Sequence, residues 1–70
     1  MREYIVNKLP MLRAEKDMTQ EELALKVGVS RQTIIAMERG NYAPSVLLAL
    51  KVASVFKKPV EEIFKISHEK

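Results

Sequence analysis

The chain has 70 residues, no cysteine, one histidine and a formal charge of +3. This length allows one domain with a small hydrophobic core, and the lack of cysteine excludes disulfides, thiolate zinc sites and a cysteine nucleophile. The apolar run Tyr4 to Val6 is far too short for a signal peptide or a membrane span, so we expect a cytosolic protein without membrane contacts. We also expect no metal, cofactor or small-molecule ligand.

Positive charge is concentrated in the middle of the chain. Residues 1 to 29 carry five cations and five anions, residues 30 to 58 carry five cations against Glu38 alone, and the last twelve residues sum to −1. A cationic centre favours polyanions such as nucleic acid. An alternative for Lys57 and Lys58 is that they only keep a small protein in solution, which explains them equally well.

The first two helices can be placed from their ends. Asn7 is a suitable N-cap for a first helix that continues to about Lys16. Thr19, with Glu22 three positions later, forms a capping box for a second helix, which Gly28 closes after about eight residues. Their buried sides are expected to consist of Leu9, Leu12, Leu23, Ala24 and Val27, with Met11 as a further candidate in the first helix.

The segment GVSRQTIIAMERG, residues 28 to 40, predicts a third helix that Ser30 caps and Gly40 ends. The three-residue linker Gly28-Val29-Ser30 requires a sharp angle between the second and third helices, and the small Ala24 and Gly28 allow their axes to approach closely. Helical spacing puts Ile34 and Met37 on the core side. The opposite side, with Arg31 at its edge, mixes a cation, an amide and small apolar groups, as expected of a recognition surface: Gln32, Ile35, Ala36 and Arg39.

Two more helices follow. Ser45 can cap SVLLALKVASVFKK, which is apolar around most of its circumference and is therefore expected to be central and buried. Pro59 stops that helix and can start a last short one, PVEEIF. The runs Tyr4-Ile5-Val6 and Lys65-Ile66-Ser67 could pair as strands. We therefore predict a compact all-α, five-helix domain over residues 1–70, with its core in 7–64, a short tail at 65–70 and room for a short terminal β pair.

The run QEELALKVGVSRQTIIAMERG closely resembles the helix-turn-helix of the phage repressor and Cro type, also called the XRE type. The likeness covers roughly residues 7 to 64, and hydrophobic spacing, caps and linker length all agree with it. It is greatest to very short stand-alone transcriptional regulators. The resemblance implies a sequence-specific DNA-binding regulator, most often a repressor, that inserts residues 31–39 into the major groove of an inverted-repeat operator.

The resemblance also implies roles for individual residues. Arg31 and Gln32 would read base edges, since arginine pairs with guanine and glutamine with adenine. Family members often carry polar residues at the positions of Ile35 and Ala36, and from the outward, apolar character of these two we predict contacts to thymine methyl groups. For Ile35 the alternative is packing within its own domain or against a partner chain. Contacts to DNA phosphates are expected from Gln20, Thr33, Arg39, Asn41 and Tyr42. The alternatives here are an ordinary first-turn polar residue for Gln20, a turn former for Asn41 and a core-edge aromatic for Tyr42.

In the family an arginine of the first helix pairs with a glutamate near the end of the third, and Arg13 and Glu38 match these positions. This pair would fix the angle of the third helix. One such domain covers only about half a turn of groove, so we expect a homodimer on double-stranded DNA, with reading helices about 34 Å apart. The expected dimer seam is Val60, Ile63, Phe64 and Ile66, although Val60 and Ile63 could instead close the monomer core.

Other functions are less well supported by the residues. The adjacent acids Glu21-Glu22 and Glu61-Glu62 suit first helical turns, and there is no phosphate-binding glycine loop or nucleophile-base pair, so no catalytic residue is assigned. The main alternative is a protein-binding module such as an antitoxin, which uses the same fold. RNA binding is disfavoured, because stacking aromatics are scarce and the RNA major groove is too narrow for a helix.

Overall fold

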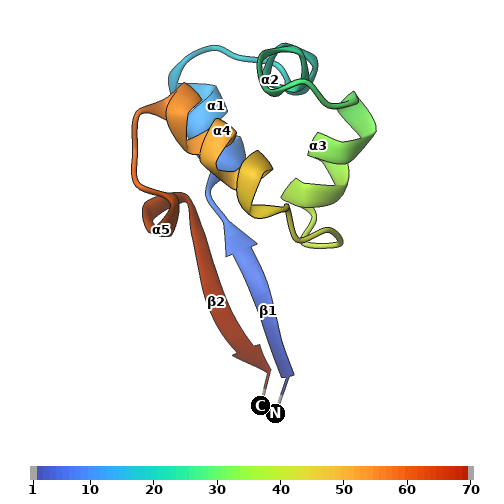
Figure 1. Ribbon diagram of the computed structural model, residues 1–70, viewed down its shortest axis with the longest axis vertical. Helices are drawn as coiled ribbons and strands as arrows, with labels where there is room; N and C mark the ends of the chain where they lie inside the picture. The colour runs from blue at the N-terminus through green and yellow to red at the C-terminus, as the bar shows by residue number, and fades with distance from the viewer. Residues whose placement is uncertain (1, 70) are drawn as a thin grey trace.

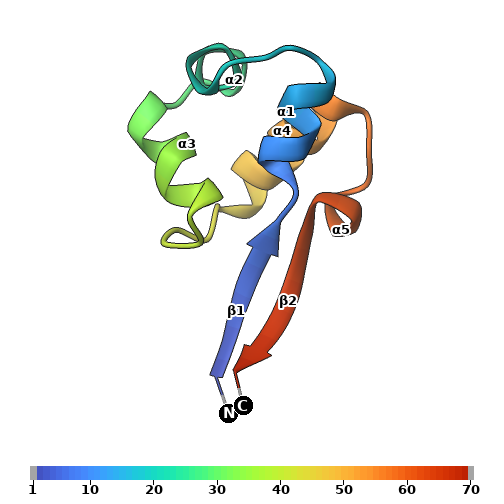
Figure 2. The same cartoon turned by 180° about the vertical axis from the view of Figure 1, so that it is seen from behind.

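The computed structural model describes residues 2–69. In this range five helices form a body, and two strands extend from it as an arm, the name used below for β1 and β2 (Figure 1). The view from behind shows the same separation of arm and body (Figure 2). The elements are β1 (Arg2–Asn7), α1 (Leu9–Glu15), α2 (Gln20–Val27), α3 (Arg31–Glu38), α4 (Val46–Phe56), α5 (Val60–Ile63) and β2 (Phe64–Glu69).

The arm is a two-stranded antiparallel sheet in which Tyr4 lies opposite Ser67 and Ile5 opposite Ile66. It is longer than the short terminal pair that we considered, and it takes up residues 65–69, which we expected to be a tail. The prediction of an all-α domain is therefore corrected to a helical domain with one small sheet. The backbone N–H of Lys8 donates to the carbonyl of Ile63 at 3.0 Å, which joins the base of the arm to the body.

Side-chain caps begin three of the helices where the sequence predicts them. Thr19 accepts from the backbone N–H of Glu22, and the Glu22 carboxylate accepts from the backbone of Thr19, which completes the capping box. Ser30 and Ser45 accept in the same way from the N–H groups three residues later. Each cap satisfies a helix-end N–H that would otherwise have no partner.

Two helix ends differ from the prediction. Asn7 is the last residue of β1, and Lys8 holds the N-cap position of α1, although the Asn7 side chain still accepts a hydrogen bond from the N–H of Leu9 at 3.1 Å. The fourth helix ends before Pro59, because Lys57 adopts a left-handed conformation with φ of 55°. Pro59 then serves as the N-cap of α5.

The hydrophobic core lies between the five helices. The residues that we assigned to the buried sides of α1, α2 and α3 are buried, except Met11, which is 51% exposed. The full set is Leu9, Leu12, Leu23, Ala24, Val27, Ile34, Met37, Leu48, Val52, Ala53, Phe56 and Ile63. In the part of the chain that the structure describes, no helix is both long and apolar enough to cross a bilayer.

Helix α4 is buried on one side only, so the prediction of a central, buried helix holds for that side and is wrong for the other. Leu48, Val52 and Phe56 face the core, whereas Val46, Leu47 and Leu50 are exposed. The prediction failed because an apolar sequence shows that a helix avoids water, and a domain of this size has too few other elements to cover its second side.

Candidate nucleic-acid interface

The corner between α2 and α3 depends on the backbone of Gly28. Gly28 has φ of 76° and ψ of 34°, a left-handed conformation that residues with a Cβ adopt only at a cost. A Cβ placed on Gly28 would meet no atom within 4 Å, so this glycine is needed for its conformation and not, as we expected, for close packing of the helices. Ser30, two residues later, caps α3 and fixes its direction.

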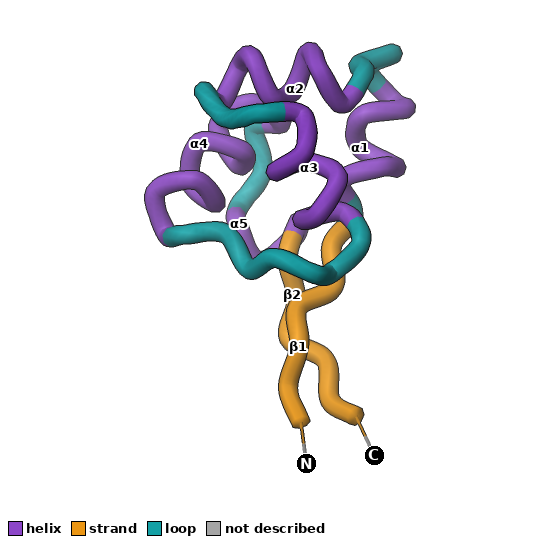
Figure 3. Tube along the Cα trace, turned by 90° about the vertical axis from the view of Figure 1, so that its right-hand side faces the viewer, coloured by secondary structure: helices purple, strands orange, loops and turns teal. Residues whose placement is uncertain are grey.

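Helix α3 divides into a buried side and an open side, as its sequence predicts. Ile34 and Met37 belong to the core, and Arg31 and Gln32 are exposed in the first turn. Ile35 and Ala36 are half-buried and so remain partly accessible. The helix lies at the surface of the body, on the side that faces the viewer in Figure 3.

The structure brings Arg13 and Glu38 together at the end of α3. Arg13 Nε donates to Glu38 Oε2 at 2.6 Å and Arg13 Nη2 to Oε1 at 3.0 Å, a bidentate pair. The side chains are only 16% and 7% exposed, so both charges are largely withdrawn from water. Arg13 Nη1 also donates to the carbonyl of Met18, which ties the turn after α1 to the same group. The pair therefore links α1 to α3 across the body.

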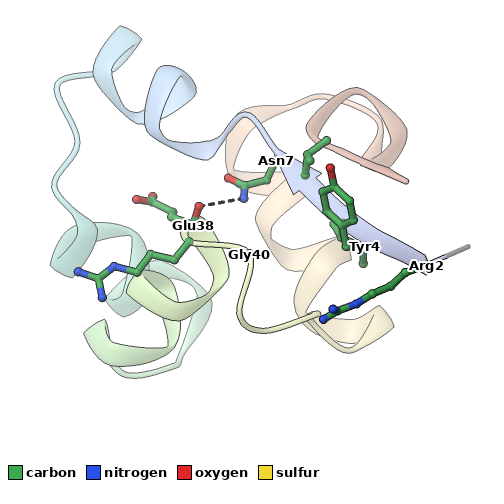
Figure 4. A pocket seen from close by; sticks show the side chains of 8 residues that line it. Arg2, Tyr4, Asn7, Glu38 and Gly40 are labelled. Carbon is green, nitrogen blue, oxygen red and sulfur yellow. Dashed lines mark hydrogen bonds between the residues drawn. The ribbon is translucent and has the colours of Figure 1, made fainter. Parts of the chain in front are cut away.

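Two further side chains hold the end of α3, and the sequence did not reveal either contact. Gln20 Nε2 donates to Glu38 Oε1 at 3.1 Å, so the carboxylate joins the first turn of α2 as well. Asn7 Nδ2 donates to the carbonyl of Met37 at 3.0 Å and to that of Glu38 at 3.4 Å. The second of these bonds is drawn in Figure 4. The end of α3 is thus fixed from α1, α2 and the base of the arm.

The residues that we predicted to touch DNA lie around α3. Gln20 and Arg31 line one open hollow of about 840 Å³, although they come from different helices. The Thr33 hydroxyl lies 3.1 Å from the Ser30 hydroxyl at the start of α3. Arg39 lines a second hollow, between β1 and the end of α3 (Figure 4). Asn41 and Tyr42 line a third, of about 440 Å³, between the loop after α3 and the arm.

Of the residues predicted for a dimer seam, one lies inside the monomer. Ile63 is fully buried and cannot contact a second chain, so the alternative that it closes the core holds for this residue. Val60 and Phe64 pack against the same core but are only half-buried. Ile66 in the arm is exposed. Val60, Phe64 and Ile66 therefore keep surface that a second chain could contact.

Acidification is expected to weaken the start of α2, because its cap depends on a charged carboxylate. The backbone N–H of Thr19 and then its hydroxyl hold the pKa of Glu22 below its ordinary value. A carboxyl group whose pKa falls on folding stabilises the protein above its ordinary pKa, and this contribution is lost as the pH drops through the lowered pKa. The melting temperature of the wild type should therefore approach that of the Glu22→Gln variant as the pH falls below about 4. A difference in melting temperature between the wild type and Glu22→Gln that stays constant with pH would contradict this role of the carboxylate.

Comparison with known proteins gives one family. The family model described as Helix-turn-helix (HTH_3) matches residues 11–63, which include α2, the corner and α3. An uncharacterized HTH-type transcriptional regulator of Methanocaldococcus jannaschii is 57% identical over 58 residues, which cover 83% of this chain and 88% of that protein.

Two proteins with named roles are also similar. A transcriptional repressor of the cryptic phage CTXphi, RstR of Vibrio cholerae, is 35% identical over 57 residues, or 81% of this chain and 51% of that repressor. The restriction-modification controller protein C.AhdI of Aeromonas hydrophila has a solved structure that superimposes with a TM-score of 0.71 and 33% identity, over 77% of this chain and 82% of that one.

Proposed function

Since this chain belongs to the helix-turn-helix family of DNA-binding transcriptional regulators, we propose that it is a dimeric repressor that inserts α3 into the major groove of an inverted-repeat operator. The observation that carries this proposal is the exposure of Arg31 and Gln32 in the first turn of a helix whose other end is fixed by three elements. Reading side chains discriminate between bases only when the helix that carries them is held rigidly.

Base recognition is assigned to the open side of α3. Arg31 can donate to guanine O6 and N7 together, and Gln32 can pair with adenine N6 and N7, each pair giving about 1–3 kcal/mol of discrimination. Ile35 and Ala36 keep accessible surface beside these residues, and we assign them to thymine methyl groups. Ile35 and Ala36 are apolar, so contact with a methyl group leaves no polar atom of theirs without a partner.

Phosphate contacts are assigned to both sides of this helix. Gln20 uses one amide hydrogen on Glu38, and its second hydrogen remains available for a phosphate. The hollow that it shares with Arg31 places both at one surface. Thr33 lies between the reading residues in the first turns of α3, Arg39 follows the last residue of the helix, and Asn41 and Tyr42 come next in the exposed loop. These contacts would set the register on DNA without reading sequence.

Repression is favoured as the regulatory outcome because RstR, a relative, is a repressor by name. A domain bound over a promoter can repress by excluding other proteins from it, whereas activation requires a further contact with them. The inverted repeat follows from pairing two copies by a two-fold axis, with the reading helices about 34 Å apart.

A salt titration separates DNA binding from the antitoxin-like alternative, which uses the same fold to bind a protein. Each phosphate neutralised by a cation contributes about −0.9 to the slope of log affinity against log salt concentration. The two Arg39 side chains of a dimer would together contribute about −2 to this slope. We expect Arg39→Ala to make the slope shallower by that amount. Binding to duplex DNA that is independent of salt, or absent at physiological salt, would favour the protein-binding alternative.

A further inference from the structure

The side chain of Asn7 joins two helices that are far apart in the sequence. Its Oδ1 accepts a hydrogen bond from the backbone N–H of Leu9 at 3.1 Å, at the start of α1. Its Nδ2 donates to the backbone carbonyls of Met37 at 3.0 Å and Glu38 at 3.4 Å, at the end of α3. One amide group therefore bridges the first turn of α1 and the last turn of α3.

The polarity of these three partners requires an amide at this position. A backbone N–H only donates and a carbonyl only accepts, so the bridging side chain must carry an acceptor and a donor at once. The Asn7 amide uses its oxygen on the N–H and can offer one hydrogen to each carbonyl. A carboxylate of the same shape has no hydrogen to donate. Asn7 is therefore a chemically specific link between the two helices.

The bridge acts on the backbone of α3, unlike the other side chains that hold the end of this helix. Arg13 and Gln20 bind the carboxylate of Glu38, which is connected to the helix by rotatable bonds. Asn7 binds carbonyls of the helix itself, and the last carbonyls of a helix have no partner within it. The position of the Asn7 amide therefore limits the position of the helix end directly.

The anchor of the bridge is itself held in place. Asn7 is the last residue of β1, which pairs with β2, and the N–H of the next residue, Lys8, donates to the carbonyl of Ile63 at 3.0 Å. Leu9 and Met37, whose backbones the bridge joins, are both core residues, with 0% and 2% of their surface exposed. The amide therefore connects two fixed points of the body.

We propose that Asn7 is a positioning residue for operator recognition, which sets the direction of α3 and thereby the placement of Arg31 and Gln32. This inference rests on the DNA-binding function proposed above. Ser30 holds the start of the helix and Asn7 its end, and two points define the direction of a rigid helix. Binding groups must be held within about 0.5 Å and 10–20° of their productive geometry. Loss of the bridge should therefore reduce discrimination between bases more than affinity for DNA in general.

Asn7→Asp tests this role with the smallest change in shape. The variant keeps an oxygen for the N–H of Leu9 and offers no hydrogen to the carbonyls of α3. The readout is the ratio of two affinities, for a duplex that the wild type enriches from a random pool and for an unrelated duplex. It is measured where circular dichroism shows native helix content. We expect the ratio to fall at least about 10-fold.

A second substitution separates loss of the donor from the added charge. Asn7→Ser supplies a neutral acceptor and no amide, and it should lower the ratio in the same way as Asn7→Asp. It also carries the test if the charge of the first variant prevents folding. In a chain with both Arg31→Ala and Gln32→Ala, Asn7→Asp should lower the ratio little further, because its effect passes through these two residues.

Val55→Ala is the control for a general loss of stability. Val55 packs against the core and lines a hollow together with Lys16 and Asp17, which lie in and before the turn after α1. Its truncation should lower stability and leave the ratio of affinities unchanged.

The outcomes distinguish this role from the proposed function. A ratio that is unchanged in Asn7→Asp and Asn7→Ser, or that falls equally in Val55→Ala, would overturn the positioning role while the function stood. An equal fall in the chain that lacks Arg31 and Gln32 would also overturn it. A wild type that prefers no duplex over any other would instead overturn the proposed function.

Discussion

Replacing Arg13 with alanine is expected to lower the free energy of unfolding by about 3 kcal/mol and to abolish most DNA binding. Removing one member of a buried ion pair typically costs about 3–5 kcal/mol, because the remaining charge stays in a poorly hydrated place. Arg13 keeps some exposure, so we expect the lower end of this range. Among residues 2–69, the Glu38 carboxylate would then retain only Gln20 as a side-chain partner. Chemical denaturation followed by circular dichroism measures the loss.

A double-mutant cycle tests whether the loss comes from the pair. Glu38→Gln alone, Arg13→Ala alone and the two together should give a coupling energy of at least about 1 kcal/mol. Arg39→Ala removes an exposed arginine at the end of the same helix and should change stability by less than about 0.5 kcal/mol. Thermal and chemical stability that are unchanged in Arg13→Ala would contradict an architectural role for the pair.

Replacing Arg31 with alanine is expected to weaken binding to the preferred operator by roughly 10- to 100-fold per half-site while leaving nonspecific binding almost unchanged. Arg31 is exposed in the first turn of α3, and a bidentate contact to guanine gives about 1–3 kcal/mol of discrimination. Its loss should therefore relax the requirement for one base pair in each half-site. Competition between operator and unrelated duplexes measures this directly.

Arg39→Ala is the matched control for that substitution. Arg39 is also exposed and lies at the opposite end of α3, where we assign it to a phosphate. Its replacement should weaken operator and unrelated DNA by similar factors. Equal effects of the two substitutions on specificity would remove the assignment of Arg31 to a base.

The caps and the corner were predictable from the sequence because they depend on residues close together in the chain. Thr19 with Glu22, Ser30 and Ser45 each satisfy N–H groups within three positions, and Gly28 supplies a conformation that few other residues adopt. The open side of α3 follows from helical spacing alone.

The contacts that fix the end of α3 were not predictable in the same way. The hydrogen bonds from Gln20 to Glu38 and from Asn7 to Met37 join residues 18 and 30 positions apart, and no local pattern requires them. The arm was underestimated for the same reason, since its strands come from the two ends of the chain. The pairing of Arg13 with Glu38 was anticipated only through the family resemblance.

The exposed side of α4 shows a different limit of prediction from sequence. Val46, Leu47 and Leu50 read as buried because aliphatic residues avoid water, yet the sequence does not say whether the same chain or another copy covers them. Burial in an assembly and burial in a monomer have the same physical cause, so composition alone cannot separate them.

The most direct test of the central claim is enrichment of random duplex DNA on the purified wild-type chain, followed by sequencing. If α3 reads the major groove from a two-fold dimer, the enriched duplexes should share an inverted repeat whose half-sites are centred about one helical turn apart. Enrichment of no common sequence at physiological salt would contradict sequence-specific recognition by Arg31 and Gln32.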